Sequence, residues 1–403
     1  MPHSMTTNYN HPARSPKDVP CPHFPRCFGC PLISVPYPEQ LERKQNLVRE
    51  ALCAHPQLST LDVPTVTPSP RRLGYRGRVK LVVGRNRDEV AIGLYVPHSH
   101  RLVDISSCPV HPLPVNQVVG YLKRKLHELS IAPYDERDDS GDLRYVDLRY
   151  SFSRRELMLT LVTRHASLPQ GEKLARALQR KFSFVTGVVQ NVNESRGNVI
   201  WGERYRMLAG RDTLLENVAG LKIAFPISVF SQANPATAQK LYQSLVSMAA
   251  LNGKENVLDL YCGVGPISLL LAGGARQVWA IDESSEAINA AKQNARRNGV
   301  GNCRFIAGDV AEKIRETTRG LPQIDCIVAN PPRKGVQPAA LGALIELGAP
   351  RIIYVSCRPQ SLARDLEHLV ESGYQIARLQ PFDMFPQTAE VETLVLLERN
   401  GRD

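Results

Sequence analysis

The sequence predicts an α/β protein of two domains: a Rossmann-like, seven-stranded domain over residues 226–403, preceded by a mixed, β-rich α/β domain over residues 63–225. Two patterns predict this division. From about residue 226, apolar runs typical of buried strands alternate with stretches of helical periodicity, as in a doubly wound sheet. Before that point, runs in which apolar and polar residues alternate follow one another with few helical patches between them, which indicates antiparallel hairpins. A chain of 403 residues can hold two or three such cores.

Three segments precede the central domain. Residues 1–20 are polar and are predicted to be a disordered lead-in, and residues 21–36 form a compact loop rich in cysteine and proline. Residues 37–62 contain a stretch at 38–54 whose apolar side chains recur at helical spacing. We expect this helical segment to pack on the C-terminal domain.

Periodicity predicts the individual elements. Strands are expected at 79–83, 90–95, 143–150, 156–163, 187–192, 256–261, 277–282, 303–308, 324–329, 351–357, 374–382 and 391–398. Helices are expected at 115–129, 170–181, 235–250, 265–273, 284–299, 310–318, 338–348 and 359–372. The strand order of the central domain does not follow from the sequence.

The composition is that of a globular protein with a polyanionic partner. Lys and Arg number 50 against 39 Asp and Glu, which gives a formal charge of +11. Seventeen consecutive residues without an acid contain Arg71, Arg72, Arg76, Arg78, Lys80, Arg85 and Arg87. This basic run fits either a solvated strand face or a surface that holds nucleic-acid phosphates.

The sequence contains no apolar run long enough for a membrane span and no signal peptide, so a cytoplasmic location is expected. No obligate protein partner is implied. The nine cysteines, an odd number without export signals, favour metal binding or catalysis over disulfides.

A strand, a glycine turn and a helix follow one another over residues 256–269, as in many cofactor sites. Gly263 and Gly265 let the backbone pass close to a ligand. No third glycine completes the dinucleotide fingerprint, because Ser268 stands in its place. The pattern therefore favours S-adenosylmethionine over a dinucleotide.

Two carboxylates follow the next two strands. Asp282 ends the second strand, where it can accept both ribose hydroxyls, and Asp309 follows the third, where it can reach an adenine amino group. Each could instead cap the following helix. The glycine turn favours the ribose role for Asp282, whereas both roles stay open for Asp309.

The fourth strand ends in Asn330-Pro331-Pro332, as in methyltransferases that modify exocyclic amines. Those enzymes carry an aromatic residue directly after the prolines, where it stacks on the flipped base. Here that residue is Arg333, which argues against amine methylation.

Cys357 ends the fifth strand and Glu392 opens the last, which predicts a thiol and a carboxylate beside the cofactor pocket. Carbon 5 of uracil accepts a methyl group only after a thiolate has added to carbon 6, and a base must then remove the carbon-5 proton. Arg358 and the following helix N-terminus are expected to lower the thiol pKa. The alternative role, a small buried hydrophobe, is assigned to Cys53, Cys303 and Cys326.

Four further thiols are those of Cys21, Cys27, Cys30 and the distant Cys108. Three close-spaced thiolates with a distant fourth can hold zinc or an iron–sulfur cluster, and the spacing alone does not decide between them.

Several motifs in fixed order resemble the RNA uracil-C5 methyltransferases, which make 5-methyluridine in tRNA and rRNA. They are Phe230-Ser-Gln-Ala-Asn234, Asp259-Leu-Tyr-Cys-Gly-Val-Gly265, Asn330-Pro-Pro-Arg333, Ser356-Cys357 and Phe382-Asp-Met-Phe-Pro-Gln-Thr-Ala-Glu-Val-Glu-Thr393. The resemblance runs from about residue 21 to the C-terminus. It implies an S-adenosylmethionine-dependent methyltransferase fold with Cys357 as nucleophile and Glu392 as base.

The same resemblance implies binding residues for the methyl donor. Gln232, Tyr261, Asp282 and Asn330 fall on donor-binding positions, and Gln232 is also a candidate for contact near the reacting base. One departure is Asp282 itself, since relatives usually carry glutamate there. A second is the segment 387–390, where relatives usually carry histidines, which puts an auxiliary histidine role in doubt.

Iron–sulfur members of this family show the same cysteine arrangement, which implies a [4Fe-4S] cluster, with zinc as the alternative. Only twenty residues precede Cys21, so we expect no additional N-terminal RNA-binding β-barrel. The resemblance is then strongest to a short bacterial enzyme that methylates a 23S rRNA hairpin loop, which favours rRNA over tRNA. A rival from another class is a metal-bearing RNA-binding protein without catalysis, and the presence of Gln232, Cys357 and Glu392 argues against it.

Overall fold

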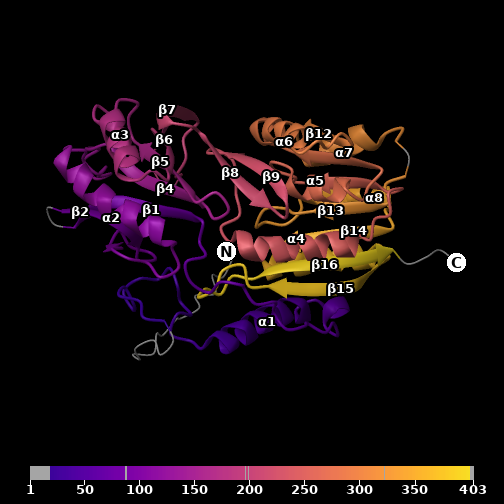
Figure 1. Cartoon of the computed structure of the whole chain (residues 1–403). Coiled ribbons are helices and arrows are strands. Elements are labelled where there is room, and N and C mark those ends of the chain that lie inside the picture. The colour runs from indigo at the N-terminus through magenta and orange to yellow at the C-terminus, as the bar shows by residue number, and fades with distance from the viewer. Residues whose placement is uncertain (1–18, 87–88, 196, 198, 322, 400–403) are drawn as a thin grey trace.

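The computed structural model describes residues 19–86, 89–195, 197, 199–321 and 323–399. Its C-terminal half is built on a seven-stranded sheet with the order β12-β11-β10-β13-β14-β16-β15 (Figure 1). The strands are β10 (Asn256–Leu260), β11 (Gln277–Asp282), β12 (Cys303–Ala307), β13 (Cys326–Ala329), β14 (Arg351–Ser356), β15 (Tyr374–Phe382) and β16 (Glu392–Arg399). All neighbours pair in parallel except β16, which runs antiparallel to both β14 and β15.

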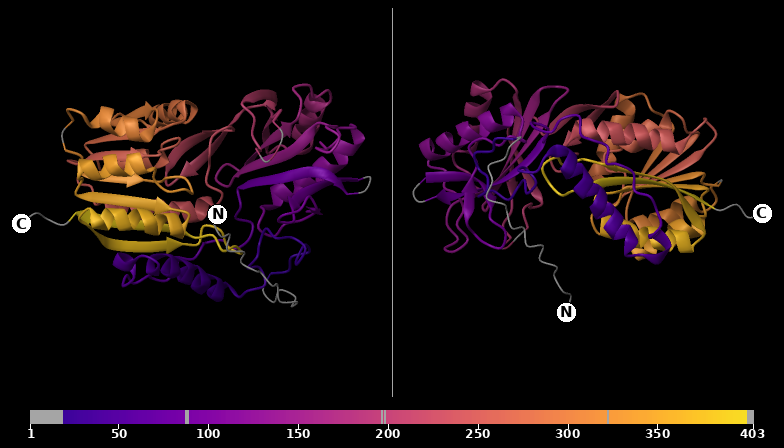
Figure 2. Two further views of the ribbon diagram at one scale, coloured as in Figure 1. Left: turned by 180° about the vertical axis from the view of Figure 1, so that it is seen from behind. Right: turned by 90° about the horizontal axis from the view of Figure 1, so that it is seen from below.

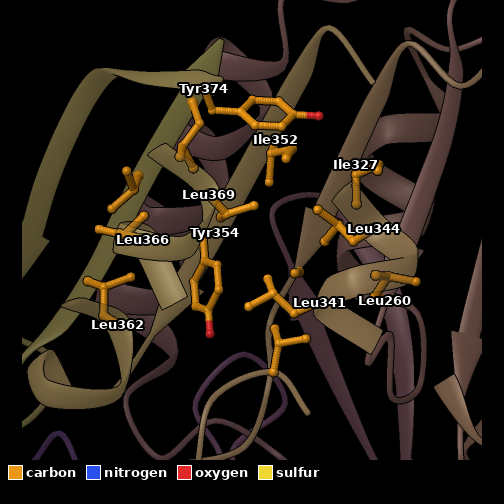
Figure 3. Packing of buried hydrophobic residues seen from close by; sticks show 14 of the residues in the cluster. Leu260, Ile327, Leu341, Leu344, Ile352, Tyr354, Leu362, Leu366, Leu369 and Tyr374 are labelled. Atoms are coloured by element: carbon orange, nitrogen blue, oxygen red, sulfur yellow. The ribbon is translucent and has the colours of Figure 1, made fainter. Parts of the chain in front are cut away.

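Helices cover both faces of this first sheet, and its central strands β10, β13 and β14 are correspondingly buried on both sides. They are α4 (Pro235–Ala249), α5 (Pro266–Ala272), α6 (Ser285–Arg297), α7 (Val310–Thr318), α8 (Pro338–Leu347) and α9 (Pro359–Glu371). On one face, Ile352 and Tyr354 of β14 meet leucines of α8 and α9 (Figure 3). The predicted strands and helices of this half are all present, with ends that differ by about two residues or fewer.

The central part of the chain forms a second seven-stranded sheet with the order β3-β2-β1-β4-β5-β6-β7. Its elements are β1 (Arg78–Asn86), β2 (Glu89–Tyr95), β3 (Leu102–Asp104), β4 (Leu143–Ser151), β5 (Glu156–Thr163), β6 (Val185–Val192), β7 (Arg204–Gly210), α2 (Leu113–Glu128) and α3 (Gly171–Lys181). Only β5 and β6 pair in parallel. Both helices pack in one core on a single face, and among the described residues the other face carries no helix but is covered in part by β8 (Thr213–Val218).

Strands β3 and β7 and the hairpin β8 (Thr213–Val218) and β9 (Leu221–Pro226) were not among the expected elements. Strand β3 has three residues, and β7 is an edge strand whose first four residues are exposed, so neither shows an apolar run. The hairpin lies between the two sheets (Figure 1), and β8 contacts β4 and β5.

The expected N-terminal helix is α1 (Tyr37–Cys53), followed by a 3-10 turn (Pro56–Leu58). Although it precedes the central sheet in sequence, α1 packs beside α9 on the C-terminal sheet (Figure 2). Its Lys44 donates to Asp383, and both side chains are fully buried. Gln40 and Gln387 exchange two hydrogen bonds of 2.9 Å. These contacts hold α1 against the loop that leads into β16.

Among the described residues, no helix has both the length and the apolar composition that crossing a bilayer requires. The expected lead-in falls mostly outside the described part of the chain.

Candidate active site

The predicted catalytic residues meet at the carboxyl-end edge of the C-terminal sheet. Cys357 directly follows β14, whereas Glu392 is the first residue of β16. Because β14 and β16 are antiparallel with Ser356 opposite Thr393, the end of one strand and the start of the other lie at the same edge. The single reversed strand thus brings a carboxylate to the edge where the thiol emerges.

Burial changes the protonation of both groups. Glu392 is 5% exposed, and burial raises its pKa to about 7; the charge of Glu390 adds to this rise and Arg333 opposes it. Burial also raises the pKa of the Cys357 thiol, and the charge of Glu392 raises it further. A carboxyl group with a pKa near neutrality is suited to take up and release a proton.

The expected lowering of the Cys357 pKa is wrong for this structure. Desolvation outweighs the favourable charges, and the cation that acts on the thiol is Arg333 rather than the adjacent Arg358. Arg333 also forms an exposed ion pair of 3.3 Å with Glu390. The residue that replaces the aromatic side chain of amine methyltransferases is therefore close enough to lower the pKa values of both the thiol and the carboxyl group.

The glycine turn is tied to the second strand by Asp282. One carboxylate oxygen accepts the Gly263 N–H at 2.9 Å, and the other accepts the Ser284 N–H at 2.9 Å. Gly263 and Tyr261 both have positive φ, at 55° and 61°. A side chain at Gly265 would meet the Phe305 ring at 3.0 Å, so this turn requires glycine for space as well as for its φ of 84°.

Asp309 caps helix α7, since its side chain accepts the Glu312 N–H at 3.1 Å. The structure thus displays the helix-cap role, and an adenine contact stays a prediction. Asn330 follows β13 and donates its N–H to the carbonyl of Leu260 at 3.3 Å. Tyr261 and Asn330 accordingly lie on neighbouring strand ends.

A cavity beside this turn is lined by residues of both domains. Gln232, Tyr261, Gly263 and Asn330 line it, together with Cys262, Tyr242, Phe230, Gly77 and Arg149. The Tyr242 hydroxyl hydrogen-bonds Gln232, and burial together with the charge of Glu392 raises the Tyr242 pKa. Gln232 thus lines the cavity and hydrogen-bonds a tyrosine that lies near Glu392.

Sequence reasoning missed Asp259, a fully buried carboxylate of β10. Burial raises its pKa to about 7, although Ser268 donates a hydrogen bond to one of its oxygens. The other oxygen has no hydrogen-bond partner among the described residues. The signal was available, since an aspartate within an apolar strand costs free energy unless it serves a purpose.

Comparisons with known proteins agree with this arrangement. The tRNA (uracil-5-)-methyltransferase family profile matches residues 36–400. An uncharacterized RNA methyltransferase of Geobacter sulfurreducens is 40% identical over 377 residues, which are 94% of this chain and 76% of that protein. A second, from Clostridium tetani, is 35% identical over 97% of this chain and 85% of that protein. The chain belongs to the RNA uracil-C5 methyltransferase family.

A solved structure with the same architecture is the Pyrococcus abyssi tRNA (uracil-54, C5)-methyltransferase in complex with S-adenosyl-L-homocysteine. Its TM-score is 0.75 at 28% sequence identity, over 93% of this chain and 86% of that one. The present protein is thus an RNA (uracil-5-)-methyltransferase whose first sheet has the strand arrangement of S-adenosylmethionine-dependent methyltransferases.

In this methyltransferase the four cysteines of the predicted cluster are neighbours. Burial raises the pKa of Cys30, and the charges of Cys108, Cys27 and Cys21 raise it further. Burial raises the pKa of Cys108 to about 11, and Asn116 holds its backbone N–H and carbonyl at 3.1 and 3.0 Å. Among the described residues, however, no three His, Cys, Asp or Glu side chains are arranged to hold a metal as they stand.

The remaining cysteines divide by exposure. Cys326 is fully buried in the apolar core and Cys303 packs against it, as expected. The prediction for Cys53 is wrong, because it lies at the exposed end of α1. The buried side of α1 is formed by Gln40, Lys44, Val48, Ala51 and Leu52, and one further residue turns Cys53 about 100° away from Leu52.

Proposed function

We propose that this enzyme methylates carbon 5 of a uridine in RNA through a covalent adduct with Cys357, with Glu392 as the base. The observation that carries the proposal is the meeting of a thiol and a buried carboxylate of raised pKa on two neighbouring strand ends. Family membership supplies the reaction, and this geometry supplies candidates for the two groups that the reaction needs.

The chemistry follows from these side chains. The Cys357 sulfur, after losing its proton to solvent, forms a bond to carbon 6, and the electron pair of the 5,6 double bond makes carbon 5 nucleophilic. Once carbon 5 carries the methyl group, the Glu392 carboxylate removes the proton that is bound to carbon 5. That electron pair restores the double bond and expels the sulfur of Cys357, so the enzyme is regenerated when Glu392 loses its proton.

S-adenosylmethionine supplies the electrophilic methyl group when bound. We assign it to Gln232, Tyr261, Gly263, Asp282, Asp309 and Asn330. The Asp282 oxygens each accept one backbone N–H, which leaves lone pairs for ribose hydroxyls. A related methyltransferase was solved with S-adenosyl-L-homocysteine, which supports this choice of donor.

We propose rRNA as the substrate, on the resemblance of the chain to a short iron–sulfur bacterial enzyme that methylates a 23S rRNA hairpin loop. The specific rival is tRNA, which is the substrate of the Pyrococcus abyssi methyltransferase. Loop nucleotides suit either choice, because their bases are already partly unstacked. Residues 63–225 are the proposed RNA-binding domain and residues 226–403 the proposed catalytic domain.

We also propose that Cys21, Cys27, Cys30 and Cys108 hold a [4Fe-4S] cluster, with zinc as the alternative. Four neighbouring thiols suit either group in kind and number. The cluster's role would be structural or RNA-contacting rather than redox, since methyl transfer moves no electrons. Anaerobic purification should give a brown protein that contains iron, whereas stoichiometric zinc without iron would reject the cluster.

The deciding experiment for the reaction is incubation of unmodified rRNA and tRNA with isotopically labelled donor, followed by mass-spectrometric mapping. The proposal expects labelled 5-methyluridine at one site in rRNA. Label at a tRNA uridine would move the substrate to tRNA. Labelled methyladenosine, or donor binding without any product, would reject uridine methylation.

A further inference from the structure

The helix-free face of the second sheet presents a row of side chains on β1. Val79, Leu81 and Val83 point into the core beneath α2, so the alternating residues Arg78 and Lys80 lie on the opposite face. Along a strand, side chains on one face stand about 7 Å apart. Arg78 and Lys80, two residues of the basic run, thus form an ordered row on this face. The last member of the run, Arg87, lies outside the described residues.

Aromatic rings are interleaved with this row next to the catalytic cavity. The Arg78 guanidinium lies 5.9 Å from the centre of the Phe230 ring and 6.0 Å from that of Trp201. Lys80 Nζ lies 5.9 Å from the Trp201 ring. Phe230 is 65% exposed and lines the cavity, so the row begins where the cavity opens.

The cavity wall below the row contains a buried guanidinium with unused hydrogen-bonding capacity. Arg149 is 1% exposed; it donates to Asp147 at 3.0 Å and to the Val229 carbonyl at 2.6 Å. Its Nη2 has no hydrogen-bond partner among the described residues. A buried donor of this kind, in the wall of a cavity, suits an anionic or carbonyl ligand.

At its other end the row reaches a second cavity that the proposed reaction does not use. Val82 follows Lys80 on the same face and pairs with Tyr145 of β4. Tyr145 and Tyr95 line this cavity, and the Arg144 guanidinium lies 5.9 Å from the Tyr145 ring. Two phenols and a guanidinium around one cavity offer flat surfaces and polar groups of the kind that hold a nucleobase.

The charges along the face suit a polyanion. Asp147 is paired with Arg149 at 3.0 Å and with Arg78 of the row at 3.5 Å, and in the second cavity Asp135 is paired with Arg137 at 3.0 Å. Glu136 also lines that cavity and contacts His100 at 3.0 Å. Asp147 and Asp135 are thus matched by arginines, whereas Glu136 meets a histidine, and the basic row itself contains no acid.

We propose that this face binds single-stranded RNA flanking the target uridine, with a base on Trp201 near the catalytic cavity and a nucleobase in the Tyr95–Tyr145 cavity. The proposal rests on the proposed function for the identity of its ligand. Alternating rings and cations bind single strands because every base has a face that can stack and every nucleotide carries a phosphate.

The test measures binding separately from catalysis. Cys357→Ala protein provides the background, and the probe is a fluorescein-labelled single-stranded oligoribonucleotide of about 12 nucleotides, a length within the range that such surfaces cover. Adding Trp201→Ala or Tyr145→Ala should each raise Kd roughly ten-fold, as expected for the loss of one stacked base. Tyr145→Phe, which keeps the ring, should retain tight binding.

A matched pair of charge variants accompanies them. Lys80→Ala should weaken binding and reduce its salt dependence, whereas Arg315→Ala, an exposed arginine of α7 on the other domain, should do neither. Unchanged Kd values for Trp201→Ala and Tyr145→Ala, with unchanged melting temperatures, would overturn the proposal.

A second measurement covers variants that fold poorly. Probe containing 4-thiouridine should crosslink, on the Cys357→Ala background, to peptides carrying Trp201 or Tyr145. Crosslinks confined to residues 226–399 would reject the RNA path. If the wild-type enzyme methylates uridine but no crosslinks form in the central domain, only the proposed RNA path is rejected. If crosslinks form at Trp201 or Tyr145 but no RNA is methylated, only the proposed function is rejected.

Discussion

The two sheets have seven strands each and differ in how their faces are covered. The first is nearly all parallel, with helices on both faces, so its working surface is the edge where strands end. The second is largely antiparallel with helices on one face, and its other face is covered only in part, where β8 packs on β4 and β5. This difference is the basis of the proposed division of labour, in which the first sheet performs the chemistry and the second holds the RNA.

The sharpest test of this division removes the nucleophile. Cys357→Ala should abolish methyl transfer while RNA binding and S-adenosylhomocysteine binding stay within about two-fold of wild type, because catalysis depends on the thiol and binding does not. Turnover is measured with labelled donor and binding by calorimetric titration. Substantial residual methylation would remove Cys357 from the mechanism, and lost RNA binding would break the division.

Replacing the base should stop the reaction after methyl transfer. Glu392→Gln leaves the carbon-5 proton in place, so turnover should fall roughly 10²- to 10⁴-fold and a covalent protein–RNA adduct should accumulate. The adduct is detected on denaturing gels with labelled RNA. Normal turnover in this variant would mean that the base lies elsewhere.

The attachment of α1 to the first sheet is tested by stability. Lys44→Met leaves the buried Asp383 carboxylate without its cation and should cost roughly 3–5 kcal/mol in urea unfolding. Arg43 precedes Lys44 and forms an exposed pair with Glu39, so Arg43→Ala should cost at most about 1 kcal/mol. Equal effects of the two variants would show that α1 does not depend on the buried pair.

The smallest expected effect concerns pH. Burial raises the pKa of Asp259 and of Glu392 to about 7, so the folded protein binds protons that the unfolded chain releases between about pH 4 and pH 7. Stability should therefore fall as pH rises through this window. Asp259→Asn should reduce the difference in melting temperature between pH 5.5 and pH 8, and exposed Asp62→Asn should leave it unchanged.

The sequence predicted the first sheet well, because strands buried on both faces read as continuous apolar runs and the helices between them are amphipathic. It did not predict β7, whose exposed Arg-Tyr-Arg-Met has no apolar face to detect. Cys357 and Glu392 could be assigned roles, but the thiol pKa was misjudged. The direction of the Cys357 pKa shift depends on burial and on the charges that the fold brings near, Arg333 among them, rather than on the adjacent Arg358.

Long-range polar contacts were beyond sequence reasoning for a related reason. Lys44 and Asp383 are separated by 339 positions, and neither stands out as a buried charge in its own segment. Arg149 and Asp147 likewise read as ordinary polar residues of an alternating strand. Only the folded chain distinguishes a solvated charge from one that holds two elements together.

The contact between α1 and the 383–390 loop joins a part of the chain that is synthesised early to one that is synthesised late. Helix α1 leaves the ribosome early and Glu392 emerges almost last, yet the loop that leads to Glu392 is seated on Gln40 and Lys44. A chain interrupted before Asp383 lacks Glu392, the proposed base, and its Lys44 lacks the carboxylate that neutralises it. Without β16 no strand brings Glu392 to the edge where Cys357 lies.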